Sequence, residues 1–492
     1  MSIQGALLTS LSSLNVLGQQ TNLISNNVAN ANTPGYAEES LSLTSLVGNG
    51  VGSGVVAGQV TSLANSAAAA VANQASSSAA YSQTMSNALS AYTSVLGQAS
   101  DTSSLSSQLS TFTNDLTSLS ATPSDGTAQS TAVNDAQSLA QTFNNLSGTI
   151  GSQREQADQA VAAGVASVNN TLNQLAQNET ARQMAAANGQ STADFINQRN
   201  QLLSTLSTEL PINVQQTGTG GITVTTDQGT TLYDGTVHAL SFTPTAVIPA
   251  NMAVTADLAN GIIGGLSQVT VDGQPISMSQ SGSIAANLQL RDVTLPGFEN
   301  QLDELAGNLI ATFQTADPTV SAGQTGLFTA NGAALDPTNS ASIGGLASTI
   351  SVNSRVDPTQ GGSVWRISQG VQAATQSTTA SNTTIIGFVD ALQSAQSATA
   401  VGGLRSATSL SDAVSQVSGQ QQSTSTTWTG LNTSRQQQAT DAQTALSNQV
   451  GVNVDDQMQR LLIVQQTYQA SAEVIQTASS MLNSLLSVFQ GA

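Results

Sequence analysis

Apolar side chains recur in alternating steps of three and four residues at both ends of this 492-residue chain. Such heptad spacing gives a helix one apolar stripe, which is the pattern of a coiled coil. The N-terminal row is Ile3, Leu7, Ser10, Leu14, Leu17, Thr21, Ile24 and Val28, and the C-terminal row is Met458, Leu461, Gln465, Tyr468, Ala472, Ile475, Ser479, Leu482, Leu486 and Phe489. An apolar stripe must be covered, so we expect the two terminal helices to pair.

The first helix is expected to end in the run from Ala31 to Tyr36. Pro34 and Gly35 suit the two central positions of a type II turn, because proline fixes φ at the first position and glycine tolerates positive φ at the second. The Gly- and Val-rich residues 41–60 then predict an extended or hairpin segment.

The middle of the chain alternates between helical and β-rich patterns. Helical periodicity occupies about 61–120, 126–187, 192–208, 293–315 and 370–490, whereas β-branched runs and Asp-Gly turns fill 211–283. We therefore expect a mainly α, elongated multidomain chain with a β-rich insertion. Its predicted domains are a terminal helical assembly domain (1–60 plus 452–492), a long-helix bundle (61–210, 284–314 and 369–451), a β-rich insert (211–283) and a Gly-, Pro- and Asn-rich β or loop segment (315–368).

Charge and apolar run length exclude several partners. Nine Arg, no Lys and 28 acidic residues give a net charge of −19, which disfavours nucleic acid and anionic lipid. No run approaches 18 uninterrupted apolar residues, so we expect no membrane insertion, and the first thirty residues lack the basic and apolar regions of a Sec signal. Any export then needs another route.

The sequence offers little for catalysis or for a cofactor. There is no Cys, and His238, the only histidine, has no Ser-x-Gly elbow or acidic residue that would orient it nearby in sequence. Asp455 and Asp456 suit a helix N-terminus, which favours acidic residues. Arg199 and Arg291 are expected to cap helices or pair with acids. We expect no catalytic residue, no metal site, no cofactor and no enzyme activity.

Four stretches resemble one family of flagellar proteins. Residues 26–36 (NNVANANTPGY) resemble the N-terminal signature of rod, hook and hook-associated proteins. Residues 197–202, 288–309 and 451–486 narrow the resemblance to the hook-associated protein 1 family. Val454 and Asp456 stand where Leu and Glu are usual in that family, and Asn200 stands where Asp is usual.

The resemblance implies a function and a set of partners. Members form a ring of subunits that joins the hook to the filament, so the expected partners are the hook protein, the second junction protein and further copies of the chain. Members leave the cytoplasm through the flagellar type III export channel, with a dedicated chaperone on the C-terminal helix. The implied location is the extracellular hook-filament junction.

Physically, the terminal helices need neighbours. A single stripe of apolar side chains does not offset the entropy of ordering an isolated helix of about 30 residues. We therefore expect the ends to order fully only between subunits, although an intramolecular core remains an alternative. The predicted assembly interface comprises Ile3, Leu7, Leu14, Leu17, Ile24, Val28, Asn32, Pro34, Gly35, Tyr36, Met458, Leu461, Tyr468, Ile475, Leu482, Leu486 and Phe489. Other readings are a hook- or rod-type protein, or an exported adhesin or enzyme carried on the β-rich insert.

Overall fold

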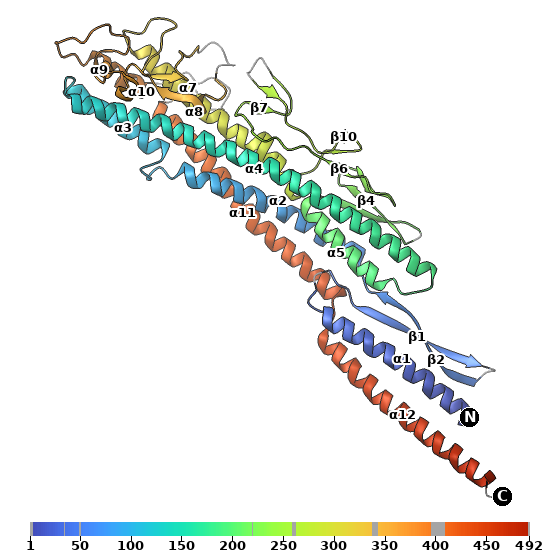
Figure 1. The fold of residues 1–492 in the computed structure, drawn as a ribbon. Coiled ribbons are helices and arrows are strands. Elements are labelled where there is room, and N and C mark those ends of the chain that lie inside the picture. Colours follow the sequence, from blue (N-terminus) through green and yellow to red (C-terminus); the bar gives the residue numbers. More distant parts are fainter. Residues whose placement is uncertain are drawn as a thin grey trace.

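The chain forms an elongated array of long helices with both termini at one end (Figure 1). The structure is a computed structural model. It describes residues 3–33, 35–48, 51–218, 220–257, 262–336, 343–394 and 409–490. The predicted fold class, mainly helical with a β-rich insertion and paired terminal helices, is confirmed.

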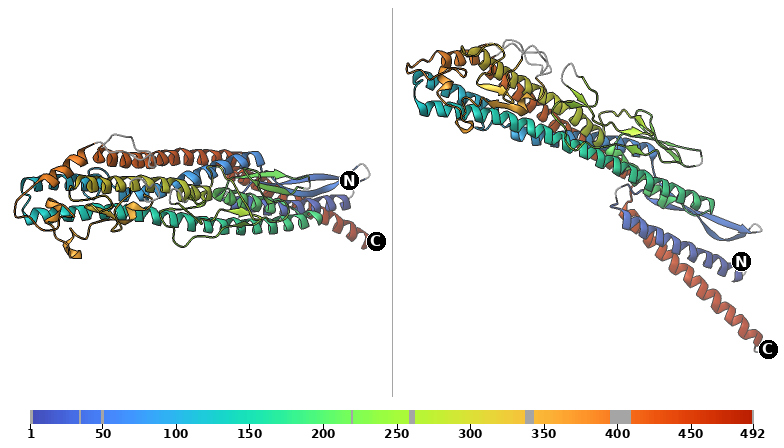
Figure 2. Two further views of the ribbon diagram at one scale, coloured as in Figure 1. Left: turned by 90° about the horizontal axis from the view of Figure 1, so that it is seen from above. Right: turned by 45° about the horizontal axis from the view of Figure 1, so that its top comes forward.

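The two terminal helices and one hairpin pack together at that end and form what we call the terminal unit. Helix α1 (Ile3–Asn30) packs along α12 (Val454–Gln490), and the hairpin of β1 (Glu39–Gly48) and β2 (Val51–Ser62) packs on another side of α1. Figures 1 and 2 show the order hairpin, α1, α12 across the unit. The extended segment predicted at 41–60 is therefore an antiparallel hairpin.

The remaining long helices form the body of the molecule. Helices α2 and α11 make the most extensive helix pair, and α3, α4, α7 and α10 pack around them. Polar side chains cap several of these helices, since Asn65, Ser104, Asp125 and Ser409 accept bonds from first-turn amides. The bounds are α2 Ser66–Leu96, α3 Leu105–Ala121, α4 Gly126–Ala187, α5 Ala193–Glu209, α6 Ser283–Gln289, α7 Leu295–Ala316, α10 Thr383–Gln393 and α11 Leu410–Val450.

Two expected helical stretches differ from the structure. Residues 370–382 form no helix, so the stretch predicted at 370–490 begins only with α10 at Thr383. The stretch predicted at 61–120 is interrupted. The pattern over 61–120 is split into α2 and α3, because the chain leaves the helix at Gly97, whose φ of 69° suits glycine. Asp101 closes the connection by accepting from the amide of Gln98 at 2.7 Å. This break contains no proline, so the apolar periodicity on either side concealed it.

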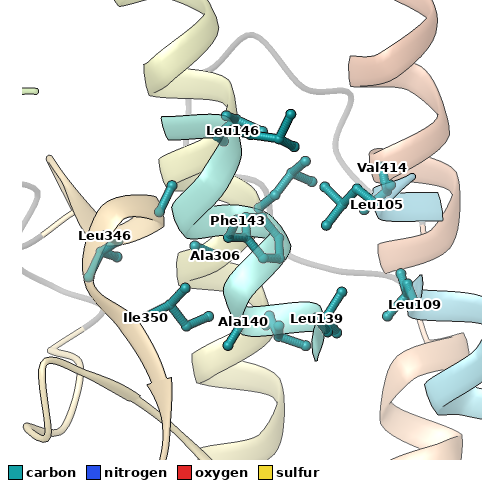
Figure 3. Packing of buried hydrophobic residues seen from close by; sticks show 14 of the residues in the cluster. Leu105, Leu109, Leu139, Ala140, Phe143, Leu146, Ala306, Leu346, Ile350 and Val414 are labelled. Carbon is teal, nitrogen blue, oxygen red and sulfur yellow. The ribbon is translucent and has the colours of Figure 1, made fainter. Parts of the chain in front are cut away.

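The body core is continuous across elements far apart in sequence. Figure 3 shows Phe143 of α4 surrounded by side chains from α3, α7, α11 and the short helix α8 (Leu346–Thr349). Phe313 of α7 lies 4.8 Å from Phe388, 5.2 Å from Phe328 and 5.6 Å from Phe112 between ring centroids. Burial of so many large apolar side chains is the main source of stability for a helical array.

The β-rich insertion lies against the second half of α4 and against α5. It consists of small sheets rather than one large sheet, with strand orders β3-β4-β5, β10-β9-β6 and β7-β8. Val224, Leu232 and Val271 pack with Val168, Leu172 and Leu206 into a second core. The strands are β3 Ile212–Gln216, β4 Ile222–Thr226, β5 Thr231–Tyr233, β6 Leu240–Ser241, β7 Met252–Ala253, β8 Ile263–Gly264, β9 Thr270–Val271 and β10 Gln274–Pro275.

The Gly-, Pro- and Asn-rich segment that follows α7 contributes to the main core. Strands β11 (Phe328–Ala330) and β12 (Ile350–Val352) pair antiparallel, with the short helix α8 (Leu346–Thr349) before β12 and α9 (Arg366–Gln369) further on. Phe328 and Ile350 are buried in the same cluster as α4 and α7. The segment therefore covers the body helices instead of looping into solvent.

Buried ion pairs join α4 to the turn before α7 and to α5. Arg291, in the π-helical turn Leu290–Thr294 before α7, donates to Asp158 at 2.5 Å and to Asp292 at 2.7 Å. Arg199 contacts Glu179 at 3.4 Å. Both arginines pair with acids, as the sequence predicted.

Candidate assembly interface

The seam between α1 and α12 has a small apolar core. Its buried members are Leu17, Ile24 and Val464, with Val28 and Leu461 packed against them. The helices run antiparallel, because Ser13 lies 3.3 Å from Ser471 and Asn27 donates to Gln457 at 3.4 Å between side-chain atoms. A core of this size leaves most of α12 without intramolecular cover.

The predicted interface residues divide into three groups. Those buried or half-buried within the unit are Ile3, Leu7, Leu14, Leu17, Ile24, Val28, Gly35, Tyr36, Leu461 and Ile475. Those exposed are Asn32, Met458, Tyr468, Leu482 and Leu486. Pro34 and the side chain of Phe489 lie outside the described residues.

The predicted stripe on α12 is displaced by one residue in one of its two rows. The structure turns Gln457, Val464, Ser471 and Ala478 toward α1, in place of the predicted Met458, Gln465, Ala472 and Ser479. Leu461, Leu462, Ile463 and Val464 are consecutive apolar residues, so periodicity alone could not fix which of them faces α1.

The turn after α1 matches the prediction where it is described. The Tyr36 amide donates to the Thr33 carbonyl at 3.1 Å, and Gly35 has φ of 79°, the value that the third position of a type II turn requires. A Cβ on Gly35 would lie 3.2 Å from the Gln201 Cγ atom. The turn therefore fixes the terminal unit closely against α5.

Asn27 holds the turn, the hairpin and both terminal helices together. Its Oδ1 atom accepts from the Tyr36 hydroxyl at 2.9 Å and from the Glu39 amide at 3.0 Å. Its Nδ2 atom donates to the Glu39 carbonyl at 2.9 Å and to Gln457. The side chain is buried, so these bonds satisfy groups that water does not reach. Within the signature of residues 26–36, the sequence alone does not distinguish Asn27 from its neighbours, because a polar amide side chain leaves no periodic pattern.

Asn197 of the body also forms hydrogen bonds to the terminal unit. Its side chain, buried on α5, accepts from the Ala37 amide at 3.3 Å and from the Ser62 hydroxyl at 3.0 Å, and donates to Glu39 at 3.1 Å. Beside it, the Glu38 amide donates to the Val450 carbonyl at 2.7 Å. These contacts define a joint between the terminal unit and the body, which consists of Asn27, Asn197 and residues 35–39 and 450–457.

Replacing Asn27 by alanine should open this joint. The substitution leaves the Glu39 amide and the Tyr36 hydroxyl without their acceptor, at about 1–3 kcal/mol for each buried polar group. We expect hydrogen exchange of the Glu39 amide to accelerate at least tenfold, since about 1.4 kcal/mol corresponds to a factor of ten. Asn26→Ala is the matched control, because the Asn26 side chain bonds only Asn30 within the same helix. Equal exchange in both variants would contradict a joint held by Asn27.

A buried carboxyl makes the joint sensitive to pH. Desolvation and the nearby Asp194 raise the pKa of Glu39 from 4.5 to about 7, while the bond from Asn197 lowers it. The folded state thus holds this proton more tightly than the unfolded chain. The contribution of Glu39 to stability is therefore largest below about pH 4.5 and declines as the pH rises through about 7.

We expect Glu39→Gln to flatten this pH dependence. Glutamine keeps an oxygen acceptor for Asn197 but does not ionise, so the wild-type chain should lose stability relative to the variant between pH 5 and pH 8. Urea unfolding of both proteins at the two pH values measures the difference. Other carboxyl groups with a raised pKa, such as that of Asp303, are present in both proteins, so their contributions cancel in the difference between the two stabilities. A difference that grows in the opposite direction would refute the assignment.

Two further sequence expectations concern ionisable side chains. Asn453 caps α12 by accepting from the amides of Asp455 and Asp456, which occupy the first turn as predicted. The expectation that His238 lacks an acidic partner is wrong, because its Nδ1 atom lies 2.7 Å from Asp272 and Asp234 is 3.5 Å from its Nε2 atom. Asp272 comes from a turn 34 residues away, so only the fold reveals the pair.

Ligand chemistry elsewhere is sparse. Within the described ranges, no three His, Cys, Asp or Glu side chains converge in a way that could hold a metal ion. None of the helices in that part of the chain combines the length and hydropathy that a bilayer crossing requires. The feature that stands out is the uncovered apolar surface of the terminal unit.

Three protein-family models match the chain in the order of its elements. The flagella basal body rod protein model matches residues 7–36, the FlgK helical domain of flagellar hook-associated proteins matches 89–326, and the C-terminal model of the flagellar basal body rod proteins FlgE, FlgF and FlgG matches 442–488. The predicted resemblance is thereby confirmed. A search of curated proteins finds no match.

Among solved structures, the hook junction protein FlgK from Burkholderia pseudomallei is similar at 18% identity and a TM-score of 0.43. The match covers 53% of this chain and 46% of that one, so this chain spans less than half the length of the relative.

Proposed function

We propose that this flagellar hook-associated protein, which carries the FlgK helical domain between two rod-protein segments, is a structural subunit that joins the hook to the filament. Its terminal helices would do so by self-assembly. The observation that carries the proposal is the terminal unit, whose paired ends coincide with the two rod-protein matches and leave apolar side chains uncovered.

The uncovered side chains are concentrated where assembly requires them. Among the described residues, α12 exposes Val454, Met458, Leu462, Ile463, Tyr468, Val474, Met481, Leu482, Leu485, Leu486 and Val488. Exposed apolar surface of this extent on one element marks an interaction site in a soluble protein. Residues 1–60 plus 452–492 would form the assembly domain, and the body would project from it.

The partners follow from this role. The subunit would bind further copies of itself in a ring, the hook protein on one side and the second junction protein on the other. Before export it would be held in the cytoplasm by a chaperone on α12, then leave through the flagellar type III channel to the extracellular junction. The proposed interface contains the seventeen residues predicted from the sequence together with Gln457 and Val464, which the structure adds.

A deletion strain tests the function directly. Without the gene, cells should build hooks of normal length and release filament protein into the medium, because filament subunits have no junction on which to assemble. Electron microscopy of the cells and analysis of the medium measure both effects. Normal filaments on the deletion strain would refute the junction role, and missing hooks would favour the hook- or rod-type alternative.

A further inference from the structure

Large parts of the terminal unit are uncharged in a strongly acidic protein. Residues 1–37, 40–100 and 474–492 contain no charged side chain, while the whole chain carries a net charge of −19. Two acidic molecules repel each other where their charges face. Copies of this chain can therefore approach most closely through the distal part of the terminal unit, where α1, the hairpin and the end of α12 meet no charge.

The end of α12 forms the first of two surfaces there. The antiparallel register pairs residue 13 with 471 and 27 with 457, so Ile3 lies level with Met481. Residues 482–490 therefore extend about 13 Å past Ile3, at 1.5 Å per residue. Figure 1 shows this projection beyond the start of α1. We call residues 482–490 the overhang. Its Leu482, Leu485, Leu486 and Val488 are 38% to 70% exposed.

The second surface lies on the other side of α1. Leu8 and Leu11 are about 60% exposed, and at 100° per residue they lie roughly opposite Ser13 and Leu17, which face α12.

The hairpin continues this surface beside α1. Ser12 accepts from the Val55 amide at 3.2 Å, and Leu46, which pairs with Gly54, is exposed together with Val47. We call Leu8, Leu11, Leu46 and Val47 the α1-hairpin patch. Among described residues β1 pairs only with β2, so its outer edge is also open.

We infer that the overhang of one copy docks on the α1-hairpin patch of a second copy. This inference rests on the proposed function and specifies the surfaces that would carry the self-assembly. The two surfaces differ and lie on opposite sides of α1, so a head-to-tail contact between them can repeat from copy to copy as a ring or a helix. Because the overhang extends beyond its own α1, a second copy that binds it must be shifted along the long axis of the first copy.

A second copy fits better than other occupants. Nucleic acid and anionic lipid recognise positive charge, which neither surface carries. Each copy supplies both the apolar, uncharged overhang and the apolar, uncharged α1-hairpin patch, so a single kind of chain is sufficient. A different axial protein with a similar patch is a separate outcome, which the experiment below distinguishes.

Cysteine cross-linking of the full chain tests the contact, because the natural sequence has no cysteine background. One preparation carries Leu486→Cys and the other carries Leu11→Cys or Leu46→Cys, and the mixture is oxidised at high protein concentration. We expect heterodimers at least tenfold above a control mixture of Leu486→Cys with Val71→Cys, an exposed site on α2. Cross-linking at the control level for both patch sites, or a predominance of symmetric Leu486 to Leu486 dimers, would overturn the inference.

Binding of the same variants to isolated hooks separates this inference from the proposed function. If the chain binds hook ends and sediments as oligomers but the patch cysteines do not cross-link, the inference fails and the function stands. If the chain cross-links through the patch but does not bind hook ends, the contact stands and the junction role fails.

Discussion

Replacing both Leu482 and Leu486 by serine is expected to abolish filament attachment without unfolding the subunit. Both side chains are exposed in the single chain, so their loss removes little intramolecular burial. In an interface each leucine contributes about 1.5–3 kcal/mol, and the pair would then weaken association by roughly 10² to 10⁴. In the deletion strain, the variant should fail to restore filaments, whereas the wild-type gene should restore them.

The controls for this variant separate assembly from folding and from export. Val71→Ser with Leu431→Ser removes two exposed apolar side chains from the body, and this protein should support normal filaments. Recovery of the Leu482/Leu486 variant from the medium shows that it was exported, and an unchanged melting temperature shows that it folds. Full motility of a strain that carries the variant would contradict a role of the overhang in the interface.

Replacing Arg291 by methionine should cause the largest loss of stability in the body. The guanidinium is buried and donates to Asp158, Asp292 and the Ser267 carbonyl, so its removal leaves the buried Asp158 without a charged partner. Breaking a buried pair in this way costs about 3–5 kcal/mol. Asp158 also accepts from the Thr245 amide at 2.6 Å, so the change should loosen the insertion from α4.

Arg460→Met provides the matched comparison for this prediction. Arg460 bridges Glu38 at 3.1 Å and Asp456 at 2.8 Å, but its side chain is half exposed. Exposed pairs contribute at most about 1 kcal/mol. Denaturant unfolding should therefore show a large shift of the midpoint for Arg291→Met and a small one for Arg460→Met. Equal shifts would mean that Arg291 contributes no more than a surface charge.

Much of this architecture can be predicted because its elements are long and periodic. Helix α4 has the predicted bounds, and the heptad rows identify α1 and α12 as partners. Apolar spacing carries this information directly, since a stripe along a helix must find cover. The same is true of the hairpin, which Gly and Val residues indicate.

Other features depend on contacts between distant segments. The sequence does not fix which side of α12 faces α1, because α12 carries apolar residues on all of its sides. Only the packing against α1 identifies Val464 as a buried residue. The joint formed by Asn27, Asn197 and Glu39 brings three polar residues together from separate elements, and polar residues leave no periodic trace. His238 and Asp272 meet for the same reason.

Hydrogen exchange of the full-length chain at low and high concentration tests most directly whether the termini depend on neighbours. We expect amides of residues 3–30 and 458–488 in the dilute monomer to exchange much faster than those of α4 and α7, and to become protected when subunits assemble. Protection of both terminal helices in the dilute monomer equal to that of α4 would show that they form a self-sufficient core, and would contradict assembly through incomplete ends.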